Sequence, residues 1–556
     1  MTLLRVARGA AALRPAFQRG VLQSATKKAF SITPRRFVAT KARLSAETPS
    51  WASFSILAAI ISSPFALWLM HDGTGIVPEL GNLTTSSECI TKNIHGPTPE
   101  EVAKMLSEGA YSVSVGHVVP NVTRYDGAQL AANSPCEDRY THGSIMMPPG
   151  DRWMAWGIFD GYCGPQMAEV LSYLAVTTIR ERYKDSLPVQ FPPNPHGEVV
   201  NRSKGPASAT HDSIVADAMQ KAFVDLDAHF VRNAAALATA YRLAEDGNFE
   251  QVDKICAGAP YAQQIKSVMN AWSGSCALVS MYDPTRNTIH TVSTGNSRAV
   301  LAELVPNEAR TASVWQPSPL SYDYCCRDPQ EASAIQDIHP GEEETVVQNG
   351  RMFGRTASRA FGDLRLKLPQ AMQWTLYRCF GGEPQFVQPI EEAKTPPYLD
   401  AQPGCVSVNL TKNGPCFMII ASDGFWERMS NEEAVDLVSC WMLAGNIAAQ
   451  QNHPGELKNI DMSRFIHKYE SNADKMTAAV PEDPIIDMRT PYSAELMTVR
   501  DSNAAVHLIR NALGGSDEKL LAARLAYQPP YARAWRDDIT VQVVFFNLDG
   551  GAFLKP

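Results

Sequence analysis

Four short segments of the chain share one pattern, in which an apolar strand ends in a carboxylate at a turn. The segments read PCEDR at 135–139, GIFDG at 157–161, IASDG at 420–424 and RDDIT at 536–540. An Asp that ends a strand before a Gly places its carboxylate beside an accessible backbone carbonyl, and hard cations such as Mg²⁺ and Mn²⁺ prefer such oxygen ligands. Acids from separate strands can hold two ions that activate a shared water. One Asp-Gly alone is more simply a turn, but four such sites predict a two-metal centre.

These carboxylates require strands and helices that bring the four segments together. Apolar runs bounded by turn residues predict strands at Trp153–Phe159, Cys276–Tyr282, Cys416–Ala421 and Ile539–Phe546. Helical patterns lie between them, at Gln166–Tyr183, Ser213–Phe230, Asn431–Ala444 and Ser502–Leu513. Because strands and helices do not alternate as a regular βαβ repeat, we expect a layered α+β domain. Polar, Pro- and Gly-rich stretches near 185–210 and 450–495 predict inserts or surface loops, and 71–110 predicts a linker with a short helix.

Composition narrows the class of protein. The chain has 556 residues, of which 45% are hydrophobic and 19% are charged, so it can bury a sizeable core. Its eleven cysteines include no CxxC pair, which argues against a disulfide scaffold and against zinc fingers. The formal net charge of −8 makes a nucleic-acid partner, and therefore a metal-dependent nuclease, a poor interpretation.

The first 50 residues differ sharply from the rest in charge. They contain ten Lys or Arg and a single acid, Glu47, in a stretch rich in Ser and Ala. Such a composition is typical of a mitochondrial presequence, with Arg35-Arg36-Phe37 resembling a processing site. A basic tail without structure is the simpler alternative. We predict a targeting presequence over 1–50.

The next segment, Trp51–Met70, has twenty residues and no charge. This is about the length that spans a bilayer, and Trp51 and Trp68 lie near its ends as interfacial aromatics do. Pro64 and four serines weaken the signal, and a buried core helix is the alternative. We predict a single transmembrane helix that anchors the protein in the inner mitochondrial membrane, although a protease could release the domain. The basic residues that precede it would keep the N-terminus in the matrix and leave the large domain in the intermembrane space.

The chain resembles the type 2C family of metal-dependent protein Ser/Thr phosphatases. The matching motifs run in family order: WGIFDGYCG (156–164), GSCALVSMYD (274–283), STGNSRAVL (293–301), HPGE (339–342), GRTASRAFGD (354–363), ASDGFWERMSNEEAVDLV (421–438) and RDDITVQVVFF (536–546). Three further stretches are similar to the mitochondrial pyruvate dehydrogenase phosphatase branch: YDGAQLAANSPCEDR (125–139), TPPYLDAQP (395–403) and DSNAAVHLIRNALGG (501–515).

The resemblance implies a four-layer αββα sandwich over 111–549, in which helices flank two antiparallel sheets and two Mg²⁺ or Mn²⁺ ions bind at one end. The ligands implied for the first ion are Asp160, the Gly161 carbonyl and Glu137, with Asp160 bridging both ions. Asp423 and Asp537 match ligands of the other ion. Asp138 matches an acid that orients metal-bound waters.

Several positions depart from the family pattern. Asn133 replaces a phosphate-contacting arginine, as it does in the pyruvate dehydrogenase phosphatase branch, and Asp538 stands where other members often carry Asn. Tyr162 replaces the histidine proposed as general acid, and a phenol with a pKa near 10 is a poorer proton donor at neutral pH. At a third, weaker metal site, Asn296 replaces an Asp and Glu427 replaces another.

Two functions follow from these residues. The first is hydrolysis of phosphoserine and phosphothreonine on mitochondrial phosphoproteins, for which the branch resemblance suggests the E1 component of pyruvate dehydrogenase in the matrix. The second, raised by Tyr162 and Asn296, is a pseudophosphatase that acts as a binding or scaffold protein. The retained acids favour the enzyme. The matrix substrate conflicts with the membrane orientation, and both expectations stand.

Overall fold

The protein is described by a computed structural model that covers residues 96–116, 118–187, 189–190, 201–202, 210–245, 259–306, 313–381, 386–410, 415–450 and 491–546. All of them belong to one compact unit, Glu79–Pro556. The predicted presequence and Trp51–Met70 lie outside the described residues, as does most of the loop expected near 450–495. Within the described ranges, no helix has the length and apolar character needed to cross a membrane.

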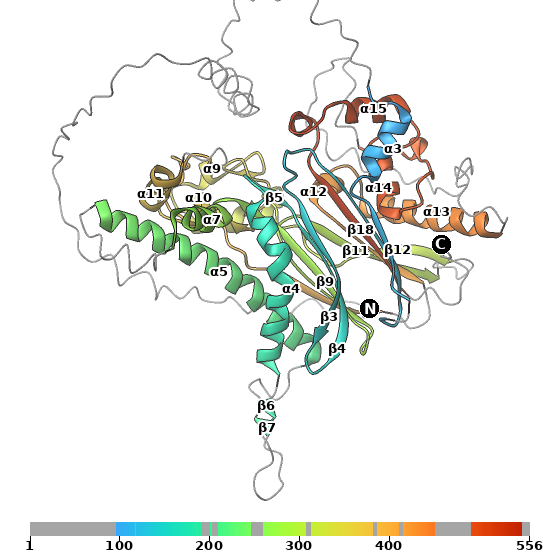
Figure 1. The fold of residues 1–556 in the computed structure, drawn as a ribbon, viewed down its shortest axis with the longest axis horizontal. Helices are drawn as coiled ribbons and strands as arrows, with labels where there is room; N and C mark the ends of the chain where they lie inside the picture. The colour runs from blue at the N-terminus through green and yellow to red at the C-terminus, as the bar shows by residue number, and fades with distance from the viewer. Residues whose placement is uncertain are drawn as a thin grey trace, which may run out of the picture. The chain divides into compact units, whose positions relative to one another are not determined.

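Two antiparallel sheets form the centre of this unit (Figure 1). The first has six strands in the order β1 (Tyr111–Ser114), β2 (Val122–Leu130), β18 (Ile539–Phe546), β17 (Cys416–Ala421), β11 (Arg298–Pro306) and β12 (Ser313–Pro319). The second has five, in the order β16 (Gly404–Asn409), β10 (Thr288–Thr294), β9 (Ala277–Asp283), β4 (Asp151–Phe159) and β3 (Arg139–Met147). Strands distant in sequence thus become neighbours, as β2 and β18 do.

Helices cover the outer face of each sheet, which gives the expected four layers (Figure 1). Over the five-stranded sheet lie α4 (Gln166–Ser186), α5 (His211–Glu245) and α7 (Tyr261–Trp272). Over the six-stranded sheet lie α13 (Asn431–Gln450), α14 (Ala504–Ala512), α15 (Glu518–Ala526) and α3 (Pro99–Ser107). The predicted α+β layered architecture is therefore confirmed.

The shorter elements cluster at one end of the layers and in the connections. The described ones are β5 (Gly161–Tyr162), β6 (Val189–Gln190), β7 (Asn201–Arg202), β8 (Gly274–Ser275), α8 (Pro329–Ile338), α9 (Glu343–Val346), β13 (Val347–Gln348), β14 (Arg351–Met352), β15 (Phe361–Gly362), α10 (Leu364–Lys367), α11 (Gln370–Phe380), α12 (Asp423–Trp426), η2 (Ala494–Leu496) and η3 (Tyr531–Ala534). Of these, β5, β8 and β15 form a small antiparallel sheet with the strand order β15-β8-β5.

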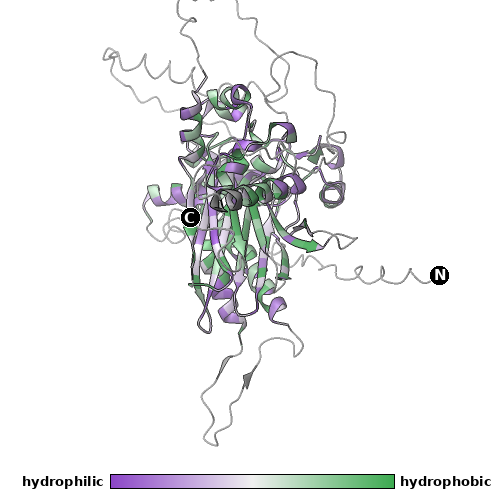
Figure 2. Cartoon of the chain, turned by 90° about the vertical axis from the view of Figure 1, so that its right-hand side faces the viewer, coloured by the Kyte–Doolittle hydropathy of each residue, from purple (hydrophilic) through white to green (hydrophobic). Residues whose placement is uncertain are grey.

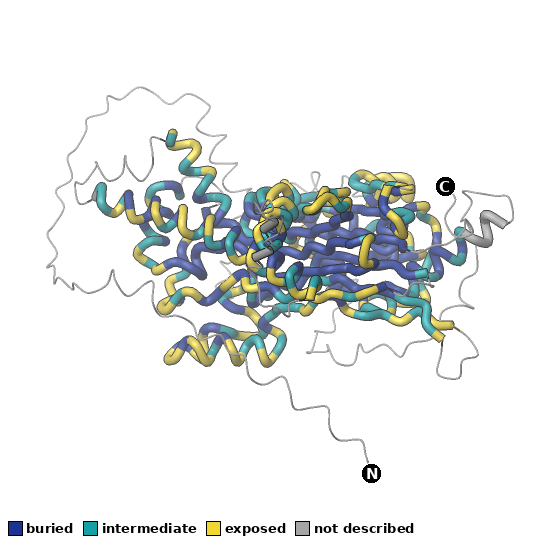
Figure 3. The backbone as a smooth tube through the Cα atoms, turned by 90° about the horizontal axis from the view of Figure 1, so that it is seen from below, coloured by how far each residue is buried: buried dark blue, intermediate teal, exposed yellow. Residues whose placement is uncertain are grey.

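The core has three main layers of apolar side chains. One lies between the two sheets, where Trp156 and Tyr282 of the five-stranded sheet both contact Phe546 of the other. The other two lie between each sheet and its helices. Hydrophobic residues concentrate on the strands in Figure 2, and the same strands are buried in Figure 3. Strands β17 and β18 are buried at every residue, which explains why β17 is an unbroken apolar run and why only Thr540 and Gln542 interrupt the apolar run of β18.

Helix starts follow from local polar residues. Thr98 caps α3, because its hydroxyl accepts from the Glu101 amide while the Glu101 carboxylate accepts from the Thr98 amide. The helix buries Val102 and Leu106 against the six-stranded side of the core. The folded domain therefore already includes the last part of the 71–110 segment predicted as a linker.

Sequence predictions and observed elements agree best in the central strands. Strands Cys416–Ala421 and Ile539–Phe546 have the predicted bounds. The helix predicted at Ser213–Phe230 runs from His211 to Glu245, because its buried stripe continues through Ala234 and Ala238. The sequence pattern underestimated the length of this helix, because alanines contribute little to the difference between its apolar and polar faces.

Candidate active site

The predicted acids meet at one end of the two sheets. Asp160 directly follows β4, while Glu137 and Asp138 directly precede its antiparallel neighbour β3. Asp423 follows β17, and Asp537 precedes the neighbouring strand β18. In antiparallel neighbours, the end of one strand lies beside the start of the next, so both sheets present carboxylates at the same end.

The carboxylates of this cluster repel one another. Burial raises the pKa of Asp160 well above its usual range, and the negative charges of Asp423, Asp138 and Asp537 raise it further. Burial also raises the pKa of Asp537 to about 7, against the opposing effect of Arg533, and Asp423 adds to the rise. The pKa of Glu137 rises to about 7, again mainly through burial. Without a bound cation, a cluster of fully ionised carboxylates destabilises the fold because the charges repel one another. Such a set of oxygen donors suits the binding of divalent cations.

The predicted metal ligands are more exposed to solvent than Asp138, the acid predicted to orient metal-bound waters. Glu137, Asp160, Asp423 and Asp537 are half-buried, so solvent or an ion can reach them, whereas Asp138 is fully enclosed. The Asp138 carboxylate accepts hydrogen bonds from the hydroxyls of Ser422, at 2.8 Å, and Thr540, at 2.7 Å. These bonds tie the end of β17 to the start of β18 and fix the carboxylate in place. That geometry suits the supporting role predicted for Asp138.

Asp538 organises the loop that carries Glu137. Its buried carboxylate accepts from the backbone amides of Ala132, Asn133 and Glu137, the last at 2.8 Å. It also accepts from the side-chain amide of Asn133 at 2.9 Å. Sequence reasoning noted Asp538 only as an unusual residue and missed this role. The Asn133 side chain, expected to stand in place of a phosphate-contacting arginine, is turned toward Asp538.

The turn after Asp160 needs glycine. A Cβ on Gly161 would lie 2.4 Å from the carbonyl oxygen of Glu137, so a side chain there would push the two ligand loops apart. The Glu137 carboxylate in turn accepts from the Gly164 amide at 2.6 Å. The sequence DGYCG therefore serves to bring the loops of Glu137 and Asp160 into contact.

A cation that the sequence analysis missed lies beside the acids. Arg533, in η3, pairs with Asp537 at 2.8 Å between Nη1 and Oδ2. Its position only four residues before Asp537 was the available signal. The guanidinium offsets part of the repulsion in the cluster and is half-exposed.

Tyr162 lies against β8. A Cβ on Gly274 would come within 2.2 Å of its ring, and the Arg355 guanidinium carbon lies 5.3 Å from the ring centroid. The tyrosine hydroxyl is buried and has no hydrogen-bond partner within the described residues. Burial, followed by the charge of Asp363, holds the pKa of Tyr162 well above its usual range. The groups that act most strongly on this hydroxyl are Asp363 and Arg355, not the four predicted metal ligands.

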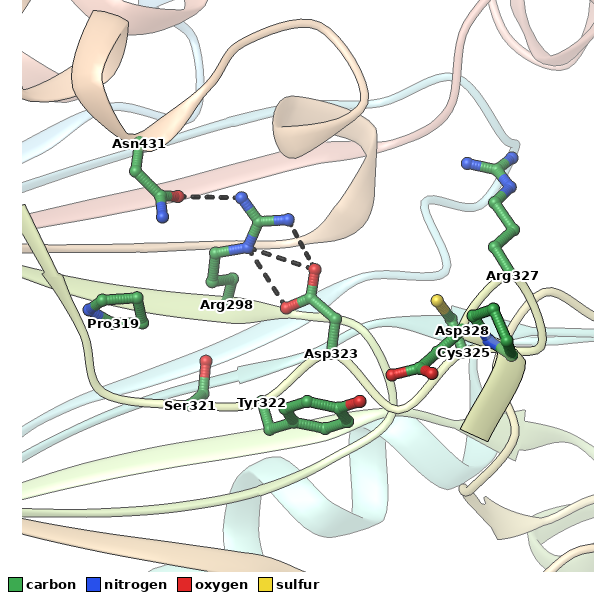
Figure 4. Close-up of a pocket in the computed structure, with 10 residues that line it drawn as sticks. Arg298, Pro319, Ser321, Tyr322, Asp323, Cys325, Arg327, Asp328 and Asn431 are labelled. Carbon is green, nitrogen blue, oxygen red and sulfur yellow. Dashed lines mark hydrogen bonds and ion pairs between the residues drawn. The ribbon is translucent and has the colours of Figure 1, made fainter. Parts of the chain in front are cut away.

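An open pocket is lined by residues of β11, β12 and α13 and of the segment that follows β12 (Figure 4). Arg298 crosses it and donates to Asn431 at 2.8 Å and to both carboxylate oxygens of Asp323. Arg327, at the opposite rim, pairs with Glu427 at 3.4 Å. Both arginines of this pocket are therefore already matched by carboxylates.

Comparisons with known proteins identify the family of this chain. The family Protein phosphatase 2C matches residues 221–455. The Protein phosphatase 2C homolog of Schizosaccharomyces pombe is 32% identical, over 82% of this chain and 88% of its own length. The chain belongs to the protein phosphatase 2C family of Ser/Thr phosphatases.

Two relatives have more specific names. The mitochondrial pyruvate dehydrogenase (acetyl-transferring) phosphatase 1 of Saccharomyces cerevisiae is 32% identical, over 77% of this chain and 69% of its own length. The human mitochondrial pyruvate dehydrogenase (acetyl-transferring) phosphatase 2 is 29% identical, over 82% and 85%. Among solved structures, a serine-threonine phosphatase 2C from Toxoplasma gondii aligns with a TM-score of 0.38 and 16% identity, over 79% of this chain and 99% of that one.

Proposed function

We propose that this protein is a metal-dependent phosphatase that hydrolyses phosphoserine and phosphothreonine on mitochondrial phosphoproteins. The observation that supports metal dependence most strongly is the crowding of half-buried carboxylates. Burial and mutual repulsion raise the pKa values of these groups. Two Mg²⁺ or Mn²⁺ ions bound there would activate a water and polarise the phosphate. Glu137, Asp160, Asp423 and Asp537, with the Gly161 carbonyl, are the residues that would hold them.

The chain's own residues would position these ligands. Asp538 fixes the loop that carries Glu137, and Asp138 connects the strands that carry Asp423 and Asp537. Asn133 lies in the same loop, where its side-chain amide donates to Asp538 at 2.9 Å. These constraints hold the carboxylates in place before any ion or substrate binds, which reduces the reorganisation needed during the reaction.

For the substrate we propose the phosphorylated E1 component of pyruvate dehydrogenase. The support is the activity in the names of the two mitochondrial relatives, together with the family membership. The acid-free basic start of the chain supports import into mitochondria. An inner-membrane anchor at Trp51–Met70 is part of the proposal and rests on the sequence alone.

The test uses purified protein and phosphorylated E1, with a phosphothreonine peptide as a general substrate. We expect phosphate release from both in Mn²⁺ or Mg²⁺, loss of release in excess EDTA, and no release by the matched variant Asp160→Asn. Release from the peptide but not from E1 would overturn the substrate. Binding of phosphorylated E1 without release from either substrate would favour the pseudophosphatase. Protease protection of mitoplasts distinguishes a domain in the matrix from one in the intermembrane space.

A further inference from the structure

Two histidines and an aspartate meet beneath the helices that cover the five-stranded sheet. His211 and Asp212 open α5, and His290 lies in β10 on the face that also carries Val292. One nitrogen of each ring and one carboxylate oxygen all lie within 4.8 Å of one another. None of the three belongs to the acidic cluster. Trp153, which stacks on His290, precedes Asp160 by seven residues of extended strand, about 23 Å.

Each histidine has one ring nitrogen fixed and the other unused. His290 Nδ1 is 2.8 Å from the Ser407 hydroxyl, and His211 Nε2 is 3.0 Å from the Tyr183 hydroxyl. The opposite nitrogens, His290 Nε2 and His211 Nδ1, are buried and have no hydrogen-bond partner within the described residues. His290 is only 1% exposed, so its free nitrogen cannot turn to bulk water. Histidine ligands of metals typically have this arrangement, in which a second group fixes the ring through its other nitrogen.

The charges around the cluster keep the imidazoles available as ligands. Burial lowers the pKa of His290 to about 4 and also lowers that of His211, so both rings are neutral near pH 7. Arg286 is the nearby cation, and it pairs with the enclosed carboxylate of Asp283 at 3.1 Å. Asp212 lies with Oδ1 3.8 Å from His211 Nδ1, and its half-exposed side chain is free to adjust.

We propose that His211, Asp212 and His290 bind one divalent transition-metal ion, with zinc as the preferred ion and water completing the site. Two imidazole nitrogens and a carboxylate oxygen are a ligand set that Zn²⁺ accepts, whereas Mg²⁺ prefers oxygen alone. Tetrahedral zinc ligands lie about 3.4 Å apart, so ligand atoms that now lie within 4.8 Å of one another must close by at most about 1.4 Å. The exposed side chain of Asp212 can move toward the two rings. The ion would fasten the first turn of α5 to the middle of β10, far from the acidic end.

The experiment titrates the purified protein with Co²⁺ in a large excess of Mg²⁺, which occupies oxygen-rich sites. We expect one Co²⁺ per chain with the intense visible absorption of a tetrahedral nitrogen-containing site, displaced by one equivalent of Zn²⁺. His211→Asn should weaken binding at least about 100-fold, and Asp212→Asn about 10-fold. His229→Asn is the matched control, because His229 is exposed on the same helix.

Two further results decide the proposal. Asp160→Asn, which alters the acidic cluster, should retain the Co²⁺ absorption at full stoichiometry. No tetrahedral Co²⁺ signal in the wild-type protein, or an equal signal in His211→Asn and His229→Asn, would overturn the site. Because His211 packs against Trp153 and Tyr183, thermal melts of each variant without metal check that folding is intact before binding is compared.

Discussion

The side-chain amide of Asn296 donates a hydrogen bond of 2.8 Å to the carboxylate of Asp423. Sequence comparison within the family placed Asn296 at a third, weaker metal site, where it removes a negative charge. The structure shows that the same substitution also gives Asp423 a neutral donor. Cys276 completes the arrangement by contacting the Asn296 carbonyl oxygen at 3.2 Å. Asn296 therefore gives the Asp423 carboxylate a hydrogen-bond donor from within the chain.

Asn296→Asp should remove this hydrogen bond. A second carboxylate at hydrogen-bond distance from Asp423 replaces an attraction with a repulsion, so we expect the metal-free protein to lose on the order of 1–3 kcal/mol of stability. A bound cation would offset the new charge, so Mn²⁺ should raise the melting temperature more in the variant than in the wild type. Thermal melts with EDTA and with Mn²⁺ measure both quantities. An unchanged metal-free melt would show that the two side chains do not interact in solution.

Removal of a cluster carboxylate should separate stability from activity. Asp160→Asn removes a carboxylate whose pKa is raised by burial and by the neighbouring acids. An acid whose pKa is raised in the folded state destabilises the fold when it is ionised. The metal-free variant should therefore melt at or above the wild type. Turnover should fall about a thousandfold or more, because several kcal/mol of transition-state stabilisation depend on the metals.

The control for this comparison is Asp537→Asn, which removes a charge but also breaks the pair with Arg533. Its turnover should fall equally, while its metal-free melt should gain less than that of Asp160→Asn. A clear destabilisation by Asp160→Asn would contradict the picture of uncompensated repulsion.

The positions of the ligand carboxylates could be predicted from sequence for a physical reason. Asp160 and Asp423 follow buried apolar strands, as the pattern predicts, and antiparallel pairing brings such strand ends beside the starts of their neighbours. Glu137 and Asp537 instead precede their strands, and the strand after Glu137, β3, is mostly polar and half-buried. The hydrogen-bond partners of those carboxylates could not be predicted from sequence, because they depend on contacts between distant segments. Asp538 is adjacent to Asp537 in sequence, yet its hydrogen bonds reach the loop at 132–137. Similarly, His211 and His290 become neighbours only when α5 packs on β10.

Tyr162 shows a second limit of sequence comparison. Its place in the motif, where the family carries a histidine, suggested the position of a general acid. In the structure the ring packs on Gly274 beside Arg355, in the satellite core that contains Val346 and Tyr398. A motif gives the position of a residue in the sequence, whereas its rotamer and packing decide the direction of its side chain.

Tyr162→Phe tests whether the hydroxyl donates a proton. Because that hydroxyl is buried without a partner and its pKa is raised, we expect kcat on a phosphoserine peptide to stay within about twofold of the wild type. Loss of a general acid would instead reduce the rate about 10²–10⁴-fold. The larger loss, seen on the peptide but not on p-nitrophenyl phosphate, would establish Tyr162 as the acid. Tyr162→Ala, which removes the ring as well, reports separately on packing.

His507 should make the fold sensitive to acid. This fully buried residue of α14 lies with Nε2 3.0 Å from the carbonyl of Leu437 in α13 and Nδ1 3.2 Å from the Asn511 amide. Both contacts suit the neutral ring with its proton on Nε2. Burial lowers the pKa of His507 to about 4, while the neighbouring Arg510 is paired with Asp501 at 2.7 Å.

The sign of the pH effect follows from this lowered pKa. Between an ordinary value near 6.5 and the folded value near 4, the unfolded chain binds a proton that the folded chain does not. Stability contributed by neutral His507 is therefore complete above about pH 6.5 and declines as the pH falls toward 4, by a total on the order of 3 kcal/mol. His507→Gln cannot titrate, so its unfolding free energy should fall less steeply over this range. Urea unfolding of both proteins in EDTA, at intervals from pH 7.5 to 4.5, gives the difference that isolates His507 from the carboxylates. Parallel curves for the two proteins would show that His507 is not the residue responsible.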